Sequence, residues 1–155
     1  MVSKGHRKAG KTGSGWEKSV ANMLNDVGFV EIDKKNIDDS VLTKWYCRQY
    51  NKFHSVYGKI AAIDLLIFDL DHFPEKLAVE LKYQASGGSV DEKFPFVILN
   101  LRRWFKRHGI KGALFLNGGK YCSEALSWVL SQQDENLFVV ESYSDVYNWI
   151  EDNLS

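Results

Sequence analysis

The sequence is poor in cysteine and proline and has no long apolar run. Its 155 residues include two prolines and two cysteines, and Cys47 and Cys122 are 75 positions apart. This spacing excludes a zinc knuckle or a disulfide scaffold. No stretch approaches the roughly 20 apolar residues that span a bilayer, and residues 1–5 lack the apolar segment of a secretory signal. We therefore expect a cytoplasmic protein with reduced thiols and no membrane partner.

A net charge is also missing, but the charges are unevenly distributed. The 20 Lys and Arg residues balance 20 Asp and Glu residues, yet residues 121–155 contain seven acidic residues and no Lys or Arg. Basic residues concentrate in two clusters, which are Lys4, Arg7, Lys8 and Lys11 near the start and Arg102, Arg103, Lys106, Arg107 and Lys111 further on. Such clusters suit a phosphate backbone. Solvated faces of a helix and a terminus would have the same composition.

The length and the 45% hydrophobic content fit one ordinary domain. Residues 1–12 are rich in Gly and Lys and are predicted to form a flexible basic arm, followed by a single domain over residues 13–155. Apolar periodicity predicts a helix over 15–28, two strands over 61–70 and 77–84, and a helix that ends near His108. After the helix that ends near His108, the pattern predicts a strand, a helix, a second strand and a last helix. This order predicts an α/β fold in which helices flank both faces of a mixed sheet with a central antiparallel hairpin.

Two acidic residues interrupt the apolar strands of this hairpin. Asp64 lies between Ile63 and Leu65, and Glu80 lies in the next strand. If the connecting turn is centred near His72, paired residue numbers sum to about 144, and Asp64 lies opposite Glu80 with Cβ atoms about 5 Å apart. Two carboxylates this close need a cation between them or a proton on one of them.

These residue types favour metal-assisted phosphodiester hydrolysis. Oxygen ligands suit Mg²⁺, or Mn²⁺ in its place. Lys82 shares a face with Glu80 because side chains alternate along a strand, so it could contact a phosphate oxygen or a metal-bound water. A buried ion pair between Lys82 and one carboxylate is the structural alternative. A shift of one residue in register would move one carboxylate to the other face of the sheet.

Asp64 followed by Glu80-Leu81-Lys82 resembles the signature of the PD-(D/E)XK nuclease superfamily, which has the restriction-endonuclease-like fold. The first helix, with Gly15-Trp16-Glu17, agrees with this resemblance. The segments 86–96 and 117–121 and the downstream Trp128 are similar to those of small bacterial and phage nucleases. One departure is that Ile63 stands where the family motif has proline, which many members lack.

The resemblance implies a role for each of these residues. Asp64 and Glu80 would bind the metal together with the Leu81 carbonyl, and Lys82 would orient or deprotonate the attacking water. Gln84 and Glu17 would support the catalytic site. The implied partner is double-stranded or branched DNA, and a homodimer is expected for double-strand cleavage. The basic residues expected to contact DNA are Lys4, Arg7, Lys8, Lys11, Lys93, Arg102, Arg103 and Lys106.

Three functions remain open at this stage. They are a sequence-specific endonuclease of restriction or mobile-element type, a structure-selective nuclease such as a Holliday-junction resolvase, and a DNA-binding module without catalysis. Residues 5–12 match the phosphate-loop pattern GxxxxGK[ST], but the four residues before them are too few and too polar for the required strand, which disfavours an NTPase. We interpret the aromatic residues of segment 45–57 as strand packing or a subunit interface rather than as a base-stacking surface.

Overall fold

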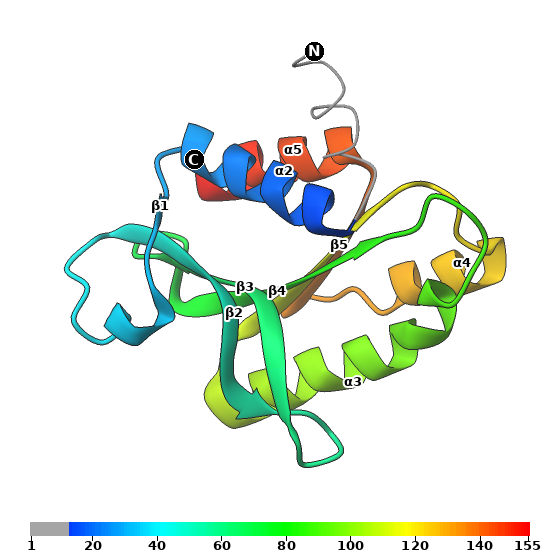
Figure 1. Cartoon of the computed structure of the whole chain (residues 1–155), viewed down its shortest axis with the longest axis horizontal. Coiled ribbons are helices and arrows are strands. Elements are labelled where there is room, and N and C mark those ends of the chain that lie inside the picture. Colours follow the sequence, from blue (N-terminus) through cyan, green and yellow to red (C-terminus); the bar gives the residue numbers. More distant parts are fainter. Residues whose placement is uncertain (1–12) are drawn as a thin grey trace.

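The computed structural model describes residues 13–155, so the predicted basic arm lies outside the described residues. Six strands form one mixed sheet with the order β1-β2-β3-β4-β5-β6, and helices cover both of its faces (Figure 1). Strands β2, β3 and β4 are antiparallel, whereas β1 pairs parallel with β2, and β4, β5 and β6 are parallel. The predicted α/β class and central hairpin are confirmed. No helix among these residues is long and apolar enough to cross a membrane.

The helices and strands occur along the chain in the predicted order. The strands are β1 (Val30–Glu31), β2 (Lys44–His54), β3 (Ile60–Asp69), β4 (Phe73–Tyr83), β5 (Lys111–Asn117) and β6 (Leu137–Glu141). The helices are α2 (Gly13–Asp26), η1 (Lys34–Asn36, a 3₁₀ turn), α3 (Val90–His108), α4 (Ser123–Ser131) and α5 (Tyr143–Leu154). β4 starts four residues earlier than predicted and includes Pro74. Proline is tolerated there because β5 pairs with β4 only from Leu77 onward.

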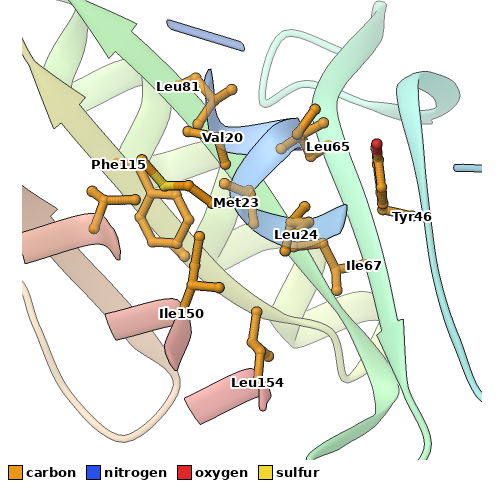
Figure 2. Packing of buried hydrophobic residues seen from close by; sticks show 14 of the residues in the cluster. Val20, Met23, Leu24, Tyr46, Leu65, Ile67, Leu81, Phe115, Ile150 and Leu154 are labelled. Atoms are coloured by element: carbon orange, nitrogen blue, oxygen red, sulfur yellow. The ribbon is translucent and has the colours of Figure 1, made fainter. Parts of the chain in front are cut away.

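Helices α2 and α5 pack on one face of the sheet (Figure 1). Figure 2 shows Val20, Met23 and Leu24 of α2 directed at the sheet, next to Ile150 of α5. The start of α2 is fixed by Trp16, which is fully buried and donates its indole N–H to the Phe115 carbonyl at 3.1 Å. Since a buried indole N–H needs a partner, this bond holds the first turn of α2 against β5.

Helix α3 packs on the opposite face, with α4 beside it (Figure 1). Its buried residues recur at three- and four-residue spacing and include Val97, Leu101 and Trp104. They pack against Leu66 of β3 and other strand residues. The helix continues through Pro95 although proline lacks a backbone N–H. Burial on both sides of the proline therefore outweighs the loss of one backbone N–H.

The register of the central hairpin is the predicted one. The pairs Leu65–Val79, Leu66–Ala78 and Ile67–Leu77 have residue numbers that sum to 144. Beyond the Leu65–Val79 pair, β3 pairs only with β2, and β4 pairs only with β5. The two strands therefore separate at the positions of Asp64 and Glu80, and we call this opening the β3–β4 fork.

Gly118 should be intolerant of a side chain because the loop after β5 passes against the end of β4. Its φ is +100°, and a Cβ at this position would lie 2.1 Å from the carbonyl oxygen of Gln84. We expect Gly118→Ala to reduce the free energy of unfolding by about 3 kcal/mol. Gly119, at φ +70° with nothing within 4 Å of an added Cβ, is the matched control. Gly119→Ala should cost only about 1 kcal/mol. Urea denaturation measures both, and equal losses would contradict the predicted close approach.

Candidate active site

The β3–β4 fork brings together the acidic residues that the sequence singled out. The Leu81 backbone N–H donates to Asp64 Oδ2 at 2.8 Å, where a backbone carbonyl of β3 would otherwise continue the ladder. In an extended strand the N–H and C=O of one residue point to the same side. The Leu81 carbonyl therefore faces the fork as well, next to the carboxylates of Asp64 and Glu80.

The fork opens into a cavity of about 240 Å³ between the sheet and α3. Asp64, Glu80 and Lys82 line it from the sheet, while α3 contributes Lys93 and Asn100, among others. Glu80 is 8% exposed, whereas a quarter of the Lys82 side chain reaches solvent. The carboxylates thus share one cavity that a phosphate can approach, and they do not point to opposite faces of the sheet.

The charges in this cavity are unbalanced. Burial raises the pKa of Glu80 well above its ordinary value of 4.5, and the nearby negative charge of Asp64 raises it further, while Lys82 acts in the opposite direction. Lys82 Nζ lies 4.0 Å from Glu80 Oε2, which is a long ion pair. One ammonium group faces two carboxylates, so burial and the charge of Asp64 favour the protonated form of Glu80 unless another cation is present. The alternative of a simple buried ion pair leaves this excess negative charge unexplained.

Glu17 of α2 reaches the same acidic region from the other side of the fork. The amide of Gln49 bridges it to Asp64, with Nε2 at 3.4 Å from both Glu17 Oε2 and Asp64 Oδ1. Burial raises the pKa of Glu17, and the charge of Asp64 raises it further. Nevertheless, no three His, Cys, Asp or Glu side chains within residues 13–155 converge as a ready metal-binding group. The sheet brings two carboxylates together at the fork, and Glu17 is connected to Asp64 through the side-chain amide of Gln49.

Gln49 is a site residue that sequence reasoning missed. It lies in β2, next to a register shift between Tyr50 and Phe53, and has a φ of +53°. A non-glycine residue in this region costs on the order of 1–3 kcal/mol, and such strain concentrates at functional sites. Lys34 Nζ donates to the Gln49 carbonyl at 3.2 Å and helps to hold this conformation. The surrounding sequence has no turn signal, so only the sheet geometry identifies this residue.

Gln84 is not brought into contact with the carboxylates. Its Oε1 accepts the Val90 N–H at 3.0 Å, and its Nε2 donates to the Lys120 carbonyl at 2.8 Å and to Asp91 Oδ1 at 3.3 Å. The side chain is 5% exposed and is fully engaged by these bonds. Gln84 therefore connects the end of β4 with the start of α3 and the loop after β5. Segments 86–96 and 117–121, which are similar to those of small bacterial and phage nucleases, both contact this residue.

The basic residues expected to contact DNA fall into separate groups. Lys93 lines the catalytic cavity, and Arg103 lines a smaller cavity further along α3. Arg102 points elsewhere, since its guanidinium donates to Asp134 Oδ2 and to the Gln132 carbonyl, both at 2.6 Å. Lys106 is exposed. The remaining candidates lie outside the described residues and are Lys4, Arg7, Lys8 and Lys11.

Comparison with known families agrees with this geometry. The model of the PD-(D/E)XK nuclease superfamily domain matches residues 8–150, so the chain belongs to the PD-(D/E)XK nuclease superfamily. Membership makes the chain a phosphodiester hydrolase of the nuclease class, whose substrate is a nucleic acid. No curated protein and no solved structure matches the chain. The resemblance drawn from Asp64, Glu80 and Lys82 is therefore confirmed at the level of the superfamily.

Glu80→Gln should stabilise the metal-free protein at neutral pH. Because the pKa of Glu80 is raised, the folded protein binds this proton more tightly than the unfolded chain does. The resulting stability is fully present below pH 4.5 and is lost as the pH rises toward the raised pKa. Glutamine does not ionise, so in EDTA at pH 7.5 the variant should melt at least roughly 2 °C higher than wild type. The gain should disappear near pH 4. Thermal unfolding followed by circular dichroism measures it, and a lower Tm at pH 7.5 would contradict the charge imbalance.

Gln49→Asn should separate the bridging role of Gln49 from its backbone conformation. Asparagine tolerates positive φ, but its side chain is one methylene shorter and cannot bridge Glu17 and Asp64. We expect a Tm within roughly 2 °C of wild type, together with a pKa of Glu17 raised further, because the bond from Gln49 lowers it. Carboxyl NMR titration measures this pKa. A Glu17 titration unchanged in Gln49→Asn would show that the amide bridge has no electrostatic role.

Proposed function

We propose that this chain is a Mg²⁺-dependent DNA endonuclease that hydrolyses phosphodiester bonds, with Mn²⁺ able to replace Mg²⁺. One observation carries the proposal: Asp64 and Glu80 share a solvent-reachable cavity beside Lys82 at the β3–β4 fork. Membership of the nuclease superfamily supports this assignment. A DNA-binding module without catalysis would have no need for two juxtaposed carboxylates at a buried position, where burial first and then the charge of Asp64 raise the pKa of Glu80.

The donor atoms at the fork fit a hard divalent cation. Two carboxylates and the backbone carbonyl of Leu81 are oxygen ligands, and their excess negative charge is what a cation would neutralise. Asp64, Glu80 and Leu81 would hold Mg²⁺ there. The bound ion would polarise the phosphate and lower the pKa of a water molecule. The Leu81 N–H would keep Asp64 oriented, because it already fixes one oxygen of that carboxylate.

Lys82 would supply the positive charge that hydrolysis needs on the substrate side. Its ammonium group lies 4.0 Å from Glu80 and is partly open to solvent, so it can donate to a phosphate oxygen or to the attacking water. Attack of water on phosphorus breaks one ester P–O bond, and negative charge grows on the phosphate oxygens in the transition state. A fixed ammonium group at this position stabilises that charge. Glu17 and Gln84 would act by positioning, through Gln49 and through the start of α3 respectively.

Double-stranded DNA is the proposed substrate, with cleavage at specific sequences. We propose residues 13–155 as a single catalytic domain and the basic residues 1–12 as an arm that contacts phosphates. Since the domain has one catalytic site, two chains related by two-fold symmetry would cut both strands of a duplex. Branched DNA is the second substrate to test, because the helix carrying Glu17 is equally suited to a junction-resolving nuclease.

Replacing the fork residues should abolish cleavage without unfolding the protein. We expect Asp64→Ala and Glu80→Ala to be inactive in Mg²⁺, and Lys82→Ala to lose at least about 100-fold in rate. DNA binding should be largely retained by all three. The control is Glu75→Ala, because Glu75 is an exposed acid at the far end of β4. It should cut like wild type. Plasmid nicking and linearisation measure the rates.

The same assay decides between the substrates. Mapped ends on plasmid DNA at one recurring sequence would support a sequence-specific endonuclease, whereas faster cutting of a synthetic four-way junction would favour a resolvase. Mg²⁺ should also raise the Tm of wild type but not that of Asp64→Ala, because a ligand stabilises only the state that binds it. Wild-type cleavage rates in Asp64→Ala or Glu80→Ala would overturn the site assignment.

A further inference from the structure

A second cavity, which is lined by basic residues, lies where the end of β2 meets the last turns of α3, and we call it the β2–α3 basic pocket. Its volume is about 120 Å³. The residues that line it are Lys52, Phe53, His54, Arg103, Trp104, Arg107 and His108. Three of them carry a positive charge and none is acidic. No salt bridge within residues 13–155 involves Lys52, Arg103 or Arg107. Their charges are therefore available to an anion.

Neutral contacts hold this pocket in shape. The Trp104 indole N–H donates to the His54 carbonyl at 2.9 Å, and the Val56 N–H donates to Asn100 Oδ1 at 2.9 Å. The rings of Phe53 and His108 stack with centroids 4.1 Å apart and planes inclined by 5°. The hairpin end is thus fixed to α3 without using the charged side chains. Positive groups brought together this way create a local positive potential that would stabilise a bound anion.

The helix dipole does not explain this cluster. Positive side chains in the last turn of a helix are favourable in themselves, and this accounts for Arg107 at the end of α3. Arg103 precedes that turn, and Lys52 comes from a different element. The helix dipole therefore does not explain why positive side chains of both β2 and α3 line the same pocket.

The pocket lies on the same face of α3 as the catalytic cavity. Trp104 lines both cavities, and the lining residues recur along the helix at intervals of three or four, from Lys93 through Asn100 to Arg107. With a rise of 1.5 Å per residue, Lys93 and Arg107 are about 21 Å apart along the helix axis. One strand of duplex DNA advances 3.4 Å per phosphate, so this distance corresponds to about six base pairs.

We propose that the β2–α3 basic pocket binds a backbone phosphate of the substrate DNA about six base pairs from the scissile phosphate. The proposal rests on the proposed nuclease function and adds the path of the duplex, along α3 from the fork toward the end of β2. It also divides the basic residues that the sequence groups together. Arg103 faces the DNA, whereas its neighbour Arg102 is held by Asp134 on the other side of α3.

Binding of a fluorescent 20-base-pair duplex in EDTA tests this pocket without cleavage. The double variant Arg103→Ala/Arg107→Ala should bind at least tenfold more weakly, and its slope of log K against log salt should fall by about one, since the pocket binds one phosphate and each phosphate contact contributes about 0.9. Lys52→Ala, on a different element, should also weaken binding, with a slope reduced by no more than about one because the same phosphate is involved. Arg103→Lys/Arg107→Lys keeps the charge and should bind within about threefold of wild type, because a lysine still contacts a phosphate as a point charge.

The charge-matched comparison is Lys18→Ala/Lys35→Ala, which removes two exposed positive charges that line neither cavity. It should bind within about threefold of wild type. Equal losses in the two double variants would overturn the pocket in favour of a diffuse field, and so would wild-type binding by Arg103→Ala/Arg107→Ala. Failure of the nuclease proposal looks different. A wild-type protein that binds through the pocket but never cuts the duplex in Mg²⁺ would overturn the proposed function alone.

Discussion

The repulsion between two carboxylates at the point where β3 and β4 separate is the constraint around which the rest of the site is arranged. Asp64 and Glu80 occupy the first positions beyond the last backbone pair of the hairpin, and Leu81 donates its N–H to Asp64. Strands that stayed paired would satisfy this N–H with a carbonyl and leave no opening. The fork therefore exchanges one ladder bond for a charged cavity, which is unfavourable for the empty protein and favourable for binding a cation.

Side chains without chemistry of their own hold the fork in place. Trp16 fixes α2 against β5 and so places Glu17 next to the site. On the other side of the fork, Tyr121 donates its hydroxyl to the carbonyls of Lys82 and Asn117, at 3.1 and 2.7 Å. Gln84 continues this connection to the start of α3. Each contact joins an element of the candidate site to a neighbouring element.

The balanced net charge conceals a separation that suits a nucleic-acid substrate. The C-terminal helix α5 carries Asp145, Glu151 and Asp152 and lies across the sheet from α3 (Figure 1). Unpaired positive charges gather on the other side, from Lys93 to Arg107 along α3. Arg102, by contrast, is neutralised by Asp134. A protein with no net charge can in this way bind a polyanion along one path and repel it elsewhere.

Much of the hairpin could be read from the sequence. Alternation along a strand already placed Glu80 and Lys82 on one face, and the polar turn near His72 was sufficient to predict the register that sets Asp64 opposite Glu80. These features depend on neighbouring residues and on one short connection, and local backbone geometry decides them. The end of α3 at His108 was predicted for the same reason.

Only the tertiary structure decided which other residues belong to the site. Gln49 acquires its positive φ from the irregular pairing of β2 with β3, and Gln84 turns away because the start of α3 supplies a buried backbone N–H for its amide. Arg102 and Arg103 are adjacent in the chain but about 100° apart around the helix, so the docking of α3 on the sheet determines that Arg103 lines the β2–α3 basic pocket while Arg102 pairs with Asp134. Contacts between distant segments set these positions, and a sequence pattern does not contain them.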